Sequence, residues 1–236
     1  MNSYQLARLM LVVAIIVVIV AKVFTKLFFG NRKLMTTRFI ARTAVFAAIS
    51  IILYTVPFLK FSIPGLFPSF LEIHLDEVPA LIAGFAYGPL SGFIIVLIKT
   101  IVKLPLTNTA CVGELADFIY STAFVIPAAL IYKHHRNIKG AIVSLAVATG
   151  VQIVVASVVT TYVMLDMYAM FYHFPKVAIL SMCQTINPNV KDLGLPFMLM
   201  VSLPFNALKD AIVIAITFVL YKRLRLLFKK IDAQKN

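Results

Sequence analysis

Charged side chains are scarce in this sequence, and acidic ones are the scarcest. Only 13% of the 236 residues are charged and 61% are hydrophobic, whereas a soluble domain carries roughly 25% charged residues. Nine acidic residues stand against 22 lysines and arginines, and tryptophan is missing altogether. The two cysteines, Cys111 and Cys183, are too few for a disulfide framework. This composition excludes a soluble globular domain and predicts a membrane protein.

The sequence also lacks the motifs of common catalytic sites. It contains no GxxxxGK[ST] loop for ATP phosphates, no HExxH zinc motif and no GxSxG nucleophile motif. No pair of histidines lies within an apolar segment. We therefore expect that the chain is not an enzyme and has no resident cofactor or metal ion.

Long apolar runs take the place of these motifs. A bilayer core of about 30 Å needs around 20 residues of helix, and a spanning segment must satisfy its backbone hydrogen bonds internally. The sequence offers seven candidate helices, over residues 4–29, 37–59, 78–88, 89–106, 113–132, 141–165 and 196–221. These ranges predict an all-α integral membrane protein with an extra N-terminal transmembrane anchor (residues 1–30), a six-helix core (37–226) and a basic tail (227–236).

Basic residues mark every second connection between these segments. They are Arg32, Lys33, Arg38 and Arg42, then Lys133, Arg136 and Lys139, then Lys222, Arg223, Arg225, Lys229 and Lys230. Because cytoplasmic loops carry the basic excess, the pattern places the C-terminus in the cytoplasm and the N-terminus outside. The excess is thus an orientation signal and not a nucleic-acid-binding surface. Both cysteines fall on the outer side, where a disulfide is chemically possible, and the sequence leaves their pairing open.

Two groups of polar residues interrupt the apolar segments. Glu114 and Asp117 lie three residues apart at the head of the fifth segment, and Asn206 and Lys209 share one face of the last. An ionisable residue at the centre of a membrane helix costs roughly 2.5–3.5 kcal/mol, so such residues indicate function. Together the two groups predict a polar pocket in the outer half of the membrane. The alternative is that Glu114 and Asp117 only stabilise a helix N-terminus.

Other polar and aromatic residues are less specific. Lys99 is deep in the fourth segment, but we expect repulsion from Lys103 on the same side and assign it no role, while Lys103 can extend to the interface. Asn108 and Thr109 occupy the next turn. The first outer loop, residues 57–79, is rich in phenylalanine, including Phe58 and Phe61. It forms either an interfacial aromatic belt or a lid over a flat, partly apolar ligand.

Five short motifs in this order resemble a known family. They are EVPALIAGFAYGPLSG (77–92), VGELADF (112–118), TINPNV (185–190), PFNALKD (204–210) and LYKRL (220–224). Over residues 37–226 the chain resembles the riboflavin-specific substrate-binding S component of energy-coupling factor (ECF) vitamin transporters. The resemblance implies a six-helix fold that binds one vitamin near the outer surface beneath the first outer loop.

The resemblance also implies roles for individual residues and partners. The implied substrate contacts are Glu114, Asp117, Asn206 and Lys209, with Asn108 and Thr109 in the neighbouring turn and Phe58 and Phe61 in the lid. The family docks its first core helix onto a transmembrane coupling (T) subunit through small residues four apart, a spacing that Ala44 and Ala48 provide. The same spacing is common in helix packing alone. Two ATPase subunits would supply the energy.

Two positions depart from the family's pattern. The family usually has asparagine where this chain has Asp117, and a Ser-Asp pair where this chain has Asp76 and Glu77. An ionised acid cannot donate a hydrogen bond, so the contacts to the ligand would differ. The ligand is therefore expected to be riboflavin, with another flavin or vitamin as the alternative. An ion- or proton-coupled secondary transporter that uses Glu114 and Asp117 is the alternative from a different class.

Overall fold

The computed structural model describes residues 36–171, 173 and 175–233, and side chains up to Arg223. The predicted N-terminal anchor, residues 1–30, lies outside the described residues. Within them the only bridge of β type is an isolated antiparallel pair, Phe61 with Ile73. The prediction of an all-α membrane protein is confirmed.

The six predicted core segments are all present as helices. Their structural counterparts, with short 3-10 or π-helical turns at some ends, are α2 (Thr37–Thr55) with η2 (Pro57–Leu59), α3 (Glu77–Tyr87), α4 (Pro89–Lys103) with η3 (Leu104–Leu106), α5 (Val112–His134), α6 (Ile138–Val159) with η4 (Thr160–Met164) and α7 (Leu165–Phe171), and α9 (Leu195–Phe197) with η5 (Met198–Ser202) and α10 (Leu203–Ala233). The sequence reading missed α8 (Lys176–Ile186). Its eleven residues are too few to span a bilayer, so it gave no membrane signal.

Five helical stretches in the described chain are long and apolar enough to cross a membrane. They are Thr37–Thr55, Pro89–Leu106, Val112–His134, Ile138–Phe171 and Leu195–Arg223. Their outward faces carry large apolar side chains, among them Val45 (60% exposed), Val143 (54%) and Val154 (63%). An apolar surface of this extent is stable against lipid and unstable against water.

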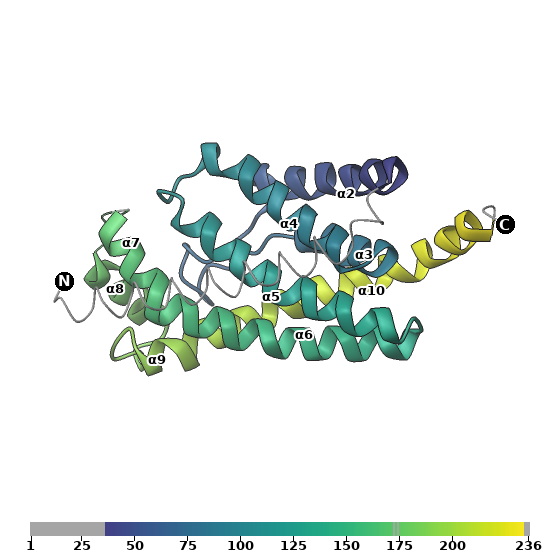
Figure 1. The fold of residues 1–236 in the computed structure, drawn as a ribbon. Helices are drawn as coiled ribbons and strands as arrows, with labels where there is room; N and C mark the ends of the chain where they lie inside the picture. Colours follow the sequence, from purple (N-terminus) through teal and green to yellow (C-terminus); the bar gives the residue numbers. More distant parts are fainter. Residues whose placement is uncertain (1–35, 172, 174, 234–236) are drawn as a thin grey trace.

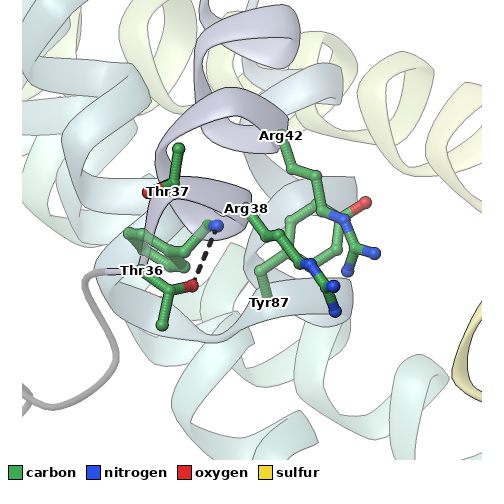
Figure 2. Close-up of a pocket in the computed structure, with 6 residues that line it drawn as sticks. Thr36, Thr37, Arg38, Arg42 and Tyr87 are labelled. Carbon is green, nitrogen blue, oxygen red and sulfur yellow. Dashed lines mark hydrogen bonds between the residues drawn. The ribbon is translucent and has the colours of Figure 1, made fainter. Parts of the chain in front are cut away.

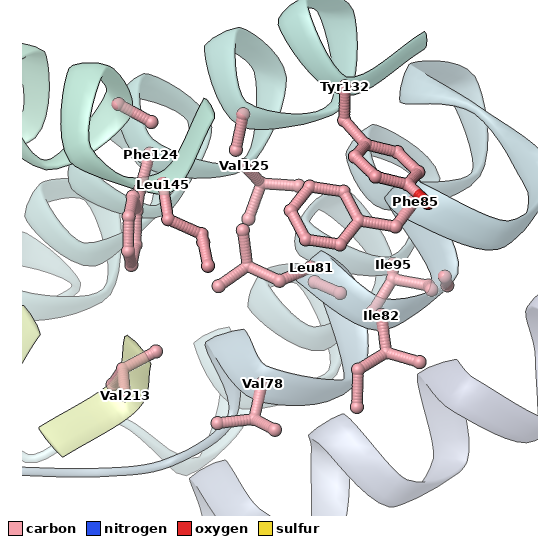
Figure 3. Packing of buried hydrophobic residues seen from close by; sticks show 14 of the residues in the cluster. Val78, Leu81, Ile82, Phe85, Ile95, Phe124, Val125, Tyr132, Leu145 and Val213 are labelled. Atoms are coloured by element: carbon pink, nitrogen blue, oxygen red, sulfur yellow. The ribbon is translucent and has the colours of Figure 1, made fainter. Parts of the chain in front are cut away.

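The short helix α3 lies at the centre of the bundle. It packs against α2, α4, α5 and α10, as Figure 1 shows, while α7, α8 and α9 gather at one end of the molecule. Nine of its eleven residues are buried. Figure 3 shows its apolar side chains, Leu81 and Phe85 among them, packed against Val125 of α5 and Val213 of α10. The central position of α3 therefore buries its first residues in the interior of the helix bundle.

Two glycines allow α3 and α4 to lie this close. Gly88 has φ +99°, a conformation that side chains disfavour, and Pro89 follows as the first residue of α4, so the chain turns sharply between the two helices. A Cβ atom at Gly92 would lie 2.6 Å from Val125 Cγ1 and 3.1 Å from the Ala80 carbonyl oxygen. Any larger residue at position 92 would separate α3, α4 and α5.

Candidate functional site

A group of buried charged side chains surrounds the start of α3. The members, called here the buried charge cluster, are His74, Asp76, Glu77, Lys99, Asp117 and Lys209. They come from the loop before α3, from α3 itself, and from α4, α5 and α10. No member is more than 9% exposed. Burying so many charges requires that each finds a partner.

Lys99 of α4 is central to the cluster. It is fully buried, and its Nζ contacts Asp76 Oδ2, lies 2.8 Å from Asp117 Oδ2 and donates to Ser121 Oγ at 2.9 Å. A lysine has three N–H donors, so all of its hydrogen-bonding capacity is used. The same Nζ lies 4.8 Å from the centre of the Tyr54 ring. One cation thus connects α2, α4, α5 and the loop before α3.

This arrangement corrects the prediction that Lys99 has no role. Lys103 forms no ion pair among the described residues, so it does not share the carboxylates that bind Lys99. The carboxylates of Asp76 and Asp117 neutralise Lys99. The signal was in the sequence, since a lysine deep in an apolar span needs a partner, but those partners lie 23 and 18 residues away.

A second cation, Lys209 of α10, completes the cluster. It donates to Glu77 Oε1 at 3.1 Å and lies 3.9 Å from Asp117 Oδ1. Ser121 Oγ also donates to Glu77 Oε1, at 3.0 Å, and joins the two lysine sites. The predicted meeting of Asp117 with Lys209 is therefore present. Glu77 and Asp76, expected in an outer connection, are instead fully buried partners of the two lysines.

The charges around Asp76 keep its carboxyl group ionised. Burial alone would raise the pKa of Asp76, but the opposing charges of His74 and Lys99 outweigh it and hold that pKa well below its usual range. His74, Asp76 and Asp117 each offer one ligand atom within 4.8 Å of the others. Because the Lys99 ammonium group already contacts both carboxylates, we interpret the group as an ion-paired cluster and assign no metal to it.

Several buried acceptor atoms near the cluster have no hydrogen-bond donor in the described part of the chain. They are Glu77 Oε2, Asp117 Oδ1, Gln152 Oε1, and both carboxyl oxygens of Asp210. A buried acceptor without a partner costs roughly 1–3 kcal/mol. A ligand that brings N–H or O–H groups would remove this cost. The site is therefore rich in acceptors and suited to a neutral, hydrogen-bond-donating ligand.

Asn206 and Glu114 occupy the edges of this region and make other contacts. Asn206 Nδ2 donates to the Ser202 carbonyl oxygen at 2.8 Å, and Asn206 Oδ1 accepts from Gln152 Nε2 at 3.4 Å. Glu114 Oε2 accepts from Thr107 Oγ1 at 2.8 Å and from Thr109 Oγ1 at 3.0 Å. The nearby threonines engage Oε2 of Glu114, and the expected pairing of Glu114 with the Asn206–Lys209 face stays a prediction. Its role toward a ligand stays a prediction.

The remaining predicted residues lie in loops near the cluster. Asn108 is exposed in the turn before α5, and Cys111, at φ +67°, ends that turn. Phe58 is 84% exposed and Phe61 45% exposed, so both are available to a ligand or to lipid. Phe61 pairs with Ile73, which ties the two ends of the loop together beside His74. The lid role stays a prediction.

The two cysteines are both free. Burial raises the pKa of the Cys183 thiol to about 11, which keeps it in the protonated, unreactive form. Both act as small apolar residues. The sequence left their pairing open, and in this structure they form no disulfide with each other.

A cavity of about 560 Å³ lies far from the cluster, at the first turn of α2. Figure 2 shows Arg38, Arg42 and Tyr87 around it, with the Phe39 N–H donating to the capping Thr36 Oγ1 at 3.2 Å. The Arg42 guanidinium carbon lies 5.5 Å from the centre of the Tyr87 ring. Arg38 and Tyr54 are separated by about 24 Å of helix, so this cavity is at the opposite end of α2 from the cluster.

Comparisons with known proteins find relatives that match most of the chain. A family model described as ECF transporter, substrate-specific component, matches residues 38–221. The riboflavin transporter RibU of Staphylococcus aureus (strain TCH60) is 31% identical over 204 residues, 86% of this chain and 99% of that protein. The riboflavin transporter FmnP of Bacillus subtilis (strain 168) is 27% identical over 189 residues, 79% and 93% of the two chains. A solved S component of a bacterial ECF transporter has a TM-score of 0.62 and 28% identity, covering 81% of this chain and 98% of its own.

Proposed function

Because this multi-pass membrane protein belongs to the family of ECF transporter substrate-specific components, we propose that it binds riboflavin and delivers it inward as the S component of an ATP-driven importer. The two relatives described above are riboflavin transporters. The observation that carries the proposal is the set of buried acceptors beside Lys209. Riboflavin offers an imide N–H and ribityl hydroxyl groups to such acceptors, and its ring carbonyls accept from a lysine.

In this proposal the substrate contacts come from the polar residues between α3, α5 and α10. Glu77 and Asp117 supply the unpartnered acceptors, Lys209 the cationic donor, and Asn206 a neighbouring amide. Glu114, with Asn108 and Thr109, borders the same region. The loop with Phe58 and Phe61 covers the flat ring system, since exposed aromatic side chains can stack on it.

We place the binding site toward the outer side of the membrane. Arg38 and Arg42 lie in the first two turns of α2, at the opposite end of that helix from Tyr54, whose ring faces the cluster. Lys222 of α10 follows Lys209 by thirteen residues, about 20 Å of rise. Basic ends face the cytoplasm, so the cluster lies in the outer half and the C-terminus inside.

The remaining partners are a transmembrane coupling subunit and two ATPase subunits. The exposed face of α2 carries Ala44 and Ala48 four residues apart, where another helix can approach closely. α2 is also the least buried of the five membrane-length helices, with 28% of its apolar stretch buried. This face, exposed among the described residues, is the proposed docking surface.

Replacing Ala48 with tryptophan is expected to block assembly without disturbing the substrate site. A large ring at a small-residue contact keeps the helices apart, so copurification with the coupling subunit and riboflavin uptake should fall by about tenfold or more. Riboflavin affinity of the isolated S component should stay within about twofold. The matched control is Ala215→Trp, on the exposed face of α10, which should assemble normally. Normal assembly of the Ala48 variant would move the docking surface elsewhere.

Neutral riboflavin is expected to bind more tightly than flavin mononucleotide. The region holds five carboxylates, of Glu72, Asp76, Glu77, Glu114 and Asp117, against the four lysines Lys60, Lys99, Lys103 and Lys209, so a phosphate group meets a small excess of negative charge. Lys60 is already engaged with Glu72 at 3.5 Å. Protein purified without added vitamin should carry a flavin, and fluorescence titration of the ligand-free protein compares the two compounds. Tighter binding of the phosphate refutes the preference, and binding of neither flavin refutes the proposed function.

A further inference from the structure

The cavity at the first turn of α2 carries positive charge that no acidic residue of the described chain neutralises. It has a volume of about 560 Å³, and Arg38 and Arg42 are among the residues that line it. Figure 2 shows both guanidinium groups on the same side of the cavity, beside Tyr87. The first turn of α2 holds no acidic residue. Neither arginine forms an ion pair with any side chain that the structure describes, so the cavity suits an anion.

The two arginines are arranged to bind a phosphate group. They are four residues apart and therefore share one face of α2. The Arg42 guanidinium carbon lies over the Tyr87 ring, 5.5 Å from its centre. A guanidinium group has N–H donors along its edge that can form paired hydrogen bonds with phosphate oxygens. Thr36 Oγ1 already accepts from the Phe39 N–H and caps the helix, so the attraction comes from the arginines and not from the helix terminus.

The cavity lies at the depth of the lipid headgroups. The membrane-length stretch of α2, Thr37–Thr55, has 19 residues, about 28 Å of rise, which is close to the roughly 30 Å of a bilayer core. Its first turn is therefore at one membrane interface, while Tyr54 and the buried charge cluster are near the other. In the proposed orientation the cavity faces the cytoplasm, where anionic lipids give the leaflet a negative surface potential.

An exposed apolar stripe continues from the two arginines along the same face of α2. Val45, Ile49 and Ile52 lie within about 40° of Arg38 around the helix. Their exposed fractions are 60%, 44% and 53%. Basic side chains at the headgroup level and apolar side chains along the bilayer core match the two parts of a phospholipid. Its phosphate group can contact the arginines while its acyl chains lie along the stripe.

We propose that this cavity binds the phosphate group of an anionic phospholipid of the cytoplasmic leaflet through Arg38 and Arg42. Basic pockets between membrane helices on the cytoplasmic side bind the headgroups of anionic lipids, and this cavity lies between α2 and the end of α3. The lipid lies beside the proposed docking surface, because Ala44 and Ala48 are roughly 100° from the stripe around α2. The inference goes beyond riboflavin binding and takes from the proposed function only the orientation of the chain.

The test titrates the purified full chain in detergent with dioleoylphosphatidylglycerol and counts bound lipids by native mass spectrometry. Dioleoylphosphatidylcholine, with the same acyl chains and no net charge, is the reference. The wild type should bind the anionic lipid about tenfold or more tightly, because each basic residue contributes roughly a factor of five. Arg38→Gln/Arg42→Gln should lose most of this preference. The matched control Arg136→Gln/Lys139→Gln removes two exposed charges at the α5–α6 connection, outside the cavity, and should keep it.

Equal binding of the two lipids by the wild type, or equal losses in the arginine variant and its control, overturns the proposal. Inorganic phosphate, at an ionic strength held constant with chloride, should not displace phosphatidylglycerol; displacement shows that the site takes a soluble anion and not a lipid. The arginines bind the partner protein instead if their variant retains phosphatidylglycerol but no longer copurifies with the coupling subunit. Riboflavin titration of the same samples tests the proposed function separately, since a wild type that binds the lipid but no riboflavin refutes only that function.

Discussion

Replacing Lys209 with methionine is expected to weaken riboflavin binding by about 10- to 100-fold, because a hydrogen bond to a charged group contributes about 1.5–3 kcal/mol. Methionine keeps most of the side-chain length and removes the ammonium group. Lys209 is the one cation that α10 brings to Glu77 and Asp117 in the described structure. Without it, ring carbonyls of the substrate lose a donor and both carboxylates lose a positive neighbour.

This variant needs a control for folding. Removing one partner of a buried ion pair leaves the other charge uncompensated, at a cost of about 3–5 kcal/mol. The fully buried Glu77 would be left in that state. The double variant Glu77→Gln/Lys209→Met removes both charges and should recover most of the thermal stability while its riboflavin affinity stays low. That separation assigns the Glu77–Lys209 pair to the substrate as well as to the fold.

Fluorescence titration gives the affinity, and thermal unfolding in detergent gives the stability. A folded Lys209→Met protein that binds riboflavin within about twofold of the wild type would show that the substrate lies elsewhere. In that case the cluster would be a structural feature of α3.

The sequence predicted the helices well because their signal is local. Apolar length alone identifies α2, α4, α5, α6 and α10. Glycine and proline at positions 88 and 89 mark the boundary between α3 and α4. The helix α8 could not be distinguished, since eleven moderately apolar residues also fit a loop at the membrane surface.

The site was only partly predictable because ion pairing is not local. The spacing of Glu114 and Asp117 places both on one face of α5, yet Asp117 is bound by Lys99 and Glu114 by the preceding threonines. No feature of the sequence indicates which of the two carboxylates pairs with a lysine and which with threonines. Likewise Asp76 and Glu77 read as loop residues, and only the position of α3 inside the bundle buries them.

Replacing Lys99 with methionine is expected to cause a larger loss of stability than the loss of either Lys103 or Lys209. Lys99 neutralises Asp76 and Asp117 and donates to Ser121. Its removal leaves Asp76 paired only with His74 among the described residues, and leaves Asp117 with His74 at 3.4 Å and Lys209 at 3.9 Å. One uncompensated buried charge costs about 3–5 kcal/mol, a large fraction of the roughly 5–15 kcal/mol that keeps a protein folded. The variant should unfold at a much lower temperature and accumulate poorly.

Lys103→Met is the matched control on the same helix, because Lys103 is also buried but has no ion-pair partner in the described residues. Its unfolding temperature in detergent should stay close to that of the wild type. Adding Asp117→Asn to Lys99→Met removes one of the two stranded charges and should restore part of the lost stability. If Lys99→Met unfolds at the same temperature as Lys103→Met, the carboxylates do not depend on Lys99, and water or protons must compensate them instead. A rescue by Asp117→Asn shows that an uncompensated carboxylate causes the loss of stability. No rescue is expected if water or protons compensate the carboxylates.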